Sequence, residues 1–68
     1  MNPGQTSFLM EVIKKVDWFS TQFEDENLYE KLSKITDDQR RYFHFTIMHN
    51  KHLKLRDLLL QIGVNPKI

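Results

Sequence analysis

The chain has 68 residues, of which 40% are hydrophobic, 28% are charged and none is cysteine, and its formal net charge is +1. Its apolar and aromatic content excludes a disordered or linker segment, and the lack of cysteine excludes disulfides and thiolate zinc sites. We expect one folded domain over residues 1–68, whose small core buries only roughly 60% of the surface that the unfolded chain exposes.

The first predicted helix covers residues 7–23. Apolar residues recur there at helical spacing, after Thr6 and Ser7, either of which can cap a helix. The core-facing stripe contains Leu9, Val12, Ile13, Val16, Phe19 and Phe23. Trp18 falls roughly opposite this stripe on a straight helix. Two alternatives remain: Trp18 is an exposed contact residue, or the helix breaks near Asp17.

A short second helix is predicted over residues 26–34, after an acidic run that interrupts the apolar pattern. Asp25 is a candidate cap for this helix. Its inward candidates are Leu28, Tyr29 and Leu32.

The third helix is predicted over residues 37–62. Thr36 and Gln39 have the spacing of a capping box, and the acidic residues of the first turn suit the helix dipole. No glycine or proline occurs until Gly63, which predicts one long helix that ends at a glycine cap. Residues 63–68 are then expected to be a flexible tail.

This long helix is apolar on two sides. One stripe contains Phe45, Met48, Leu55, Leu59 and Ile62, and Tyr42, Leu53 and Leu60 lie roughly 120° away from it. The second side either packs on a shorter helix or meets another chain. The sequence therefore predicts an all-α fold, a small three-helix domain with a long C-terminal helix and a core of Leu9, Val12, Ile13, Val16, Phe19, Met48, Leu55 and Leu59.

Charge is unevenly distributed along the chain. Residues 1–38 contain four lysines and eight acidic residues, whereas residues 39–68 contain six basic residues and one acidic residue. Either the two halves neutralise each other in the folded domain, or the basic half faces an acidic partner.

Catalytic and metal-binding motifs are not evident, so we expect no enzyme, no cofactor and no metal site. There is no cysteine, no glycine-rich phosphate loop and no nucleophile motif. Of the three histidines, only His49 and His52 have a helical spacing that could share an ion, and no third ligand is adjacent.

Nucleic-acid binding has some support, because cations and aromatic residues alternate in the last predicted helix. The cations do not form one continuous stripe, so binding would be mainly to phosphates and sensitive to salt. A helix-turn-helix is disfavoured, because no short helix pair joined by a glycine-type turn is evident.

Between Thr36 and His49 the sequence is similar to the third helix of the Hha family of nucleoid-protein modulators, which act through a larger DNA-binding protein. Phe43 and His49 carry the likeness together with the capping box. Met48 stands where the family has an acidic residue, and the C-terminal tryptophan is missing. The likeness implies a way to act on transcription without contacting bases.

The leading hypothesis is a small non-catalytic regulator or inhibitor that binds a larger protein of the transcription, nucleoid or phage–host machinery. The expected partner-binding anchors are Trp18, Tyr42, Phe43, Leu53 and Leu60. The expected steering charges are Arg40, Arg41, Lys51, Lys54 and Arg56. Direct nucleic-acid binding is the alternative, and an obligate homo-oligomer, for example a homodimer, is the third.

We also expect a cytoplasmic protein with no membrane partner, because the chain shows no basic leader and no apolar run of the ~20 residues that a membrane span needs. The lack of alanine, with plentiful lysine and isoleucine, is typical of AT-rich bacterial or phage genes.

Overall fold

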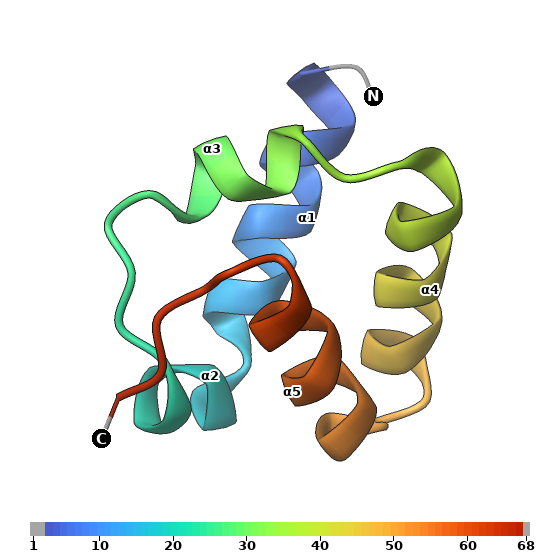
Figure 1. The fold of residues 1–68 in the computed structure, drawn as a ribbon. Helices are drawn as coiled ribbons and strands as arrows, with labels where there is room; N and C mark the ends of the chain where they lie inside the picture. The colour runs from blue at the N-terminus through green and yellow to red at the C-terminus, as the bar shows by residue number, and fades with distance from the viewer. Residues whose placement is uncertain (1–2, 68) are drawn as a thin grey trace.

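Five helices occupy most of residues 3–67, the part of the chain that the computed structural model describes (Figure 1). They are α1 Pro3–Lys15, α2 Asp17–Gln22, α3 Leu28–Ser33, α4 Asp37–Met48 and α5 His52–Gln61. The helix α1 packs against α2 and α3, and α4 packs against α5. The all-α prediction is confirmed, but the predicted three-helix arrangement is wrong, because two of the predicted helices are each split in two.

The first split lies at Val16, where the backbone is extended, with φ −76° and ψ 113°. The predicted helix over 7–23 is therefore two helices, and α1 begins earlier than expected, at Pro3, a residue type favoured in the first helical position. The bend turns Trp18 away from the polar side of α1, so its ring packs against the core instead of projecting into solvent. Of the two alternatives for Trp18, the helix break near Asp17 is the one that the structure shows.

The second split lies at residues 49–51, so the predicted long helix over 37–62 is also wrong. Asn50 has φ 53°, a left-handed conformation that asparagine tolerates better than most residues. An unbroken helix of 26 residues would be roughly 39 Å long, whereas the molecule extends only 30 × 26 × 20 Å. The turn folds α5 back onto α4, which places the apolar residues of both helices in one core.

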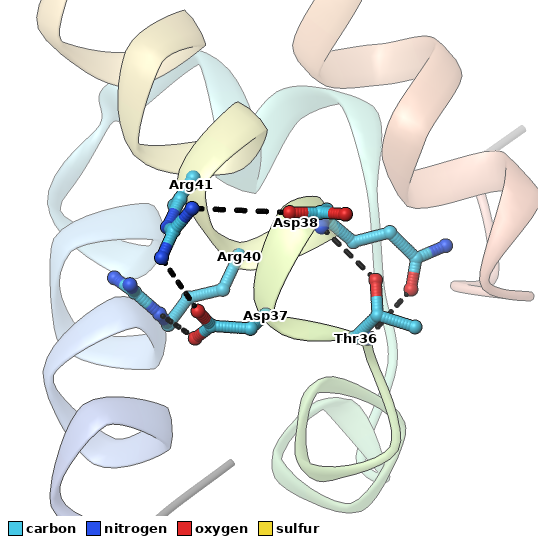
Figure 2. A network of polar contacts seen from close by, with 6 residues as sticks. Thr36, Asp37, Asp38, Arg40 and Arg41 are labelled. Carbon is cyan, nitrogen blue, oxygen red and sulfur yellow. Dashed lines mark hydrogen bonds and ion pairs between the residues drawn. The ribbon is translucent and has the colours of Figure 1, made fainter.

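The start of α4 agrees with the sequence. The amide of Gln39 donates to Thr36 Oγ1 at 3.1 Å, and the amide of Thr36 donates to Gln39 Oε1 at 2.8 Å (Figure 2). This reciprocal pair is the predicted capping box. It explains why the helix begins at Asp37.

The C-terminal segment is not a free tail over residues 63–67, which corrects that prediction; Ile68 lies outside the described residues. Gly63 ends α5 with φ 85°, and Val64 is buried in the core. The amide of Glu24 donates to the carbonyl of Asn65 at 3.0 Å, and the amide of Lys67 donates to that of Gln22 at 2.7 Å. The segment therefore runs antiparallel to residues 22–24 and covers one side of the core (Figure 1).

The Asp25 side chain, only 1% exposed, fastens this segment to the body of the domain. It accepts hydrogen bonds from the amides of Asn27 at 2.8 Å and Asn65 at 2.9 Å, and it forms an ion pair with Lys31. Lys31 Nζ also donates to the carbonyl of Gly63 at 2.7 Å. Burial raises the pKa of the Asp25 carboxyl, but the bonds from Lys31, Asn65 and Asn27 lower it by more, so the pKa lies below its ordinary value of 3.8.

Every helix and the C-terminal segment contribute residues to the core. Its buried apolar residues are Leu9, Ile13, Phe19, Phe23, Leu28, Leu32, Ile35, Phe43, Leu55, Leu59 and Val64. Val12 and Val16 are half-buried at its edge, and Tyr29, an inward candidate from the sequence, is exposed. The radius of gyration is 10.7 Å, close to the roughly 11 Å expected for a compact chain of this length.

Candidate protein-interaction face

The structure keeps three of the five predicted anchors on the surface. Tyr42, Leu53 and Leu60 are exposed, and Leu53 has the largest exposed fraction of any large apolar residue described, at 81%. Phe43 is fully buried and Trp18 is half-buried. Phe43 and Trp18 are therefore not free anchors, which corrects the prediction for both.

Phe43 lies on the inner side of α4 together with Thr46. Trp18 is held by two ring contacts: its ring stacks on His52 at a centroid distance of 5.3 Å, and it meets Phe23 edge-on at 5.9 Å. The contact with His52 joins α2 to α5, and the contact with Phe23 lies within α2 and its C-cap. Both residues stabilise the fold instead of presenting a surface.

For Phe45 and Met48 the prediction was wrong in the other direction, because these residues are more exposed than expected. The sequence placed them on the apolar stripe of the long helix, with Met48 in the core, yet Phe45 is 46% and Met48 is 66% exposed. The stripe was predicted for one straight helix, but the turn at residues 49–51 interrupts that helix. The residues of the stripe before the turn therefore face a different direction from those after it. Exposed apolar residues therefore lie along both α4 and α5, as Tyr42, Phe45, Met48, Leu53 and Leu60.

A groove separates α4 from α5 on the side of Tyr42. It consists of two adjoining hollows of about 280 and 260 Å³, and Tyr42 and Leu58 line both of them. Lys54 Nζ lies 3.5 Å from the Tyr42 hydroxyl and so bridges the two helices across this groove. We use the name α4–α5 groove face for the groove-lining residues Tyr42, Lys54 and Leu58 together with Leu53 and Leu60, which are exposed on α5 outside the groove walls. Its walls are partly apolar and its borders carry both signs of charge, with Asp38, Lys54 and Asp57 among the lining residues.

The predicted steering charges fall into two groups. Arg40 pairs with Asp37 at 3.2 Å, and Arg41 pairs with Asp37 at 3.1 Å and with Asp38 at 3.9 Å (Figure 2). These two arginines are neutralised within the first turns of α4. Lys51, Lys54 and Arg56 are exposed and form no ion pair with any carboxylate in residues 3–67. Of the predicted steering charges, the three without an ion pair therefore lie at the start of α5.

The three histidines are distributed over three different aromatic rings. His44 stacks near Phe8 at 6.4 Å, His49 packs on Phe45 at 4.5 Å, and His52 stacks on Trp18. The turn separates His49 from His52, so their helical spacing does not hold. Within residues 3–67 no group of three histidine or acidic residues is arranged to hold a metal ion.

The connection between α4 and α5 contradicts the expectation that no short helix pair joined by a glycine-type turn is present. The two helices are joined by a three-residue turn in which Asn50 takes the positive φ usually given to glycine. A short helix pair joined by a glycine-type turn is therefore present. The second helix exposes Leu53, Lys54, Arg56, Asp57, Leu60 and Gln61, so its surface mixes apolar side chains with hydrogen-bond donors.

Comparison with models of known protein families, with curated proteins and with solved structures gave no match to this chain. No helix within residues 3–67 combines the length and the apolar character that crossing a membrane requires. The candidate function must therefore be inferred from the surface itself.

Proposed function

We propose that this protein is a small non-catalytic regulator or inhibitor that binds a larger protein through the α4–α5 groove face. The exposure of Leu53, the most exposed large apolar residue described, on the same helix that forms one wall of the groove supports this proposal. Burying one such side chain contributes about 1.5–3 kcal/mol to association. Compact interfaces typically combine a few apolar or aromatic anchors with a polar border.

The groove has the layout that an interface of this kind needs. Tyr42 supplies a rigid amphipathic ring, whose hydroxyl is within reach of Lys54, and Leu53 and Leu60 supply apolar surface on α5. Lys54 lines the groove, and it lies with Lys51 and Arg56 at the start of α5, where the three cations without an ion pair favour an acidic partner through faster association. A partner of the transcription, nucleoid or phage–host machinery is the class we favour.

Affinity capture from a nuclease-treated lysate of the native host tests this proposal. The bait is the full chain, compared with a Tyr42→Ser/Leu53→Ser variant and with a Tyr29→Ser control, which removes an exposed aromatic ring on α3. We expect one discrete protein that the control retains and the groove variant loses. Retention by all three baits, or recovery that vanishes with nuclease, would contradict the groove as a protein-binding surface.

Direct nucleic-acid binding is the alternative, because the unpaired cations cluster at the start of α5. Such binding would fall steeply with salt, by about one power of the salt concentration for each phosphate neutralised. A binding isotherm for duplex DNA at several salt concentrations distinguishes it from protein binding. An obligate homo-oligomer remains the third candidate, for which melting would depend on protein concentration.

A further inference from the structure

The outer surface of α4 carries two exposed apolar residues, Phe45 and Met48, that neither the core nor the groove uses. Arg41, Phe45 and Met48 have the spacing i, i+4 and i+7 and so line up along one side of the helix. Asp38 precedes them by nearly one turn, and Lys51 follows them after the helix ends. We call these five residues the outer strip. Its helical part, from Asp38 to Met48, is roughly 15 Å long.

The two ends of the outer strip carry opposite charges. The Asp38 side chain is 96% exposed, and its nearest cation, Arg41, is 3.9 Å away and closer to Asp37 (Figure 2). At the other end, the amide of Lys51 donates to the carbonyl of Thr46 at 2.8 Å, which holds Lys51 against the last turn of α4. Lys51 has no ion pair with a described carboxylate. The strip therefore has the exposed carboxylate of Asp38 beside Arg41 at its start, apolar side chains in the middle and Lys51 at its end.

A strip with this layout is complementary to itself when two copies lie antiparallel. Phe45 is seven residues after Asp38 and six before Lys51. A twofold axis near Phe45 therefore places the two Phe45 rings together and sets Asp38 of each copy opposite Lys51 of the other. The contact uses the same patch on both subunits, as closed dimers do.

We propose that the outer strip of α4 is a self-association surface through which two copies form an antiparallel twofold dimer. Two copies bury the exposed Phe45 and Met48 side chains, which are otherwise left in water. A contact of about two to three helical turns is at the small end of specific interfaces, so the dimer is weak and reversible. The strip borders the groove face, since the rings of Phe45 and Tyr42 lie 6.2 Å apart, but the dimer contact uses neither Leu53 nor Lys54, so this inference does not depend on the proposed function.

Sedimentation velocity of the full chain from about 10 μM to about 1 mM tests self-association in the range of small interfaces. We expect the sedimentation coefficient to rise with concentration toward that of a dimer. Phe45→Ser should keep the chain monomeric throughout, while Tyr29→Ser, which changes an exposed ring on α3, should not. A monomer at every concentration, or association that Phe45→Ser leaves unchanged, would overturn the proposal.

Charge exchange tests the antiparallel arrangement. Asp38→Lys alone and Lys51→Glu alone each place like charges opposite one another at two symmetric contacts, and should weaken the dimer on the order of tenfold. The double variant Asp38→Lys/Lys51→Glu restores opposite charges and should recover most of the affinity. Lys14→Glu, on exposed α1 surface, is the matched control and should have no effect. Failure of the double variant to recover, with helical content unchanged by circular dichroism, would rule out this pairing.

Discussion

Replacing Asp25 by asparagine removes the charge that fastens the C-terminal segment to the rest of the domain. The carboxylate accepts bonds from two backbone amides and from Lys31. An asparagine has one acceptor oxygen, so at least one of these donors loses its partner at a side chain that is only 1% exposed. Such a loss costs about 1–3 kcal/mol, and bonds to charged groups fall in the upper half of that range. We therefore expect the free energy of unfolding to fall by about 2–3 kcal/mol.

That loss is large for a chain of this size, whose total stability is expected to be roughly 3–10 kcal/mol. The melting temperature should fall by roughly 10–20 °C. Thermal and urea unfolding at neutral pH, followed by circular dichroism, measure both quantities. Glu26→Gln, which makes the same charge change at the exposed neighbour, is the control and should melt like the natural chain. Equal melting of the Asp25 and Glu26 variants would refute the argument.

The pH dependence gives an independent check. Because the pKa of Asp25 is lower in the folded than in the unfolded chain, the folded state binds fewer protons, and the carboxylate stabilises the fold above the unfolded value. This contribution is lost as the pH falls through the folded pKa, below 3.8. The difference in stability between the natural chain and Asp25→Asn should therefore shrink between about pH 5 and about pH 2. A difference that stays constant over this range would show that the charge is not responsible.

Three further predictions can be measured by urea unfolding. Phe43→Ala should lower the free energy of unfolding by about 3–5 kcal/mol, because the ring is fully buried. Phe45→Ala should change it by less than about 0.5 kcal/mol, because that ring is exposed. Similar losses for both variants would contradict the assigned faces of α4. Gly63→Ala should lower the free energy of unfolding by about 1 kcal/mol. No atom lies within 4 Å of the added methyl group, so the cost comes from the backbone conformation, with φ at 85°. An unchanged urea midpoint would refute this. Thr36→Ala should cost about 1 kcal/mol through loss of the helix cap, and Ser33→Ala, at an exposed hydroxyl outside the cap, should cost less.

The features of the fold that were predicted correctly depend on local interactions. The capping box joins residues three apart, and the glycine at the end of α5 acts through its own backbone angle. The apolar periodicity also placed Leu9 and Ile13 in the core, because both residues lie within the single helix α1.

The candidate site was predicted only in part. The side-chain directions were assigned as if residues 37–62 formed one straight helix, whereas the chain turns at residues 49–51. On one straight helix, Met48 and Leu55 share a stripe, and Phe43 lies off it. Once the chain reverses there, α4 and α5 present different sides to the core, so Phe43 is buried and Met48 is exposed. Asn50 was the available signal for this turn, since asparagine is the commonest non-glycine residue with positive φ.

By itself, the sequence determined the helical class, the starts and stops that carry caps, and the uneven distribution of charge. Tertiary structure decided where the helices break and which apolar side chains remain on the surface. The physical reason is size: a core this small cannot cover a helix of roughly 39 Å, so the chain folds back at residues 49–51 within a molecule 30 Å long. The burial of Asp25 beside the C-terminal segment depends on contacts between residues far apart in the sequence, which local patterns do not encode.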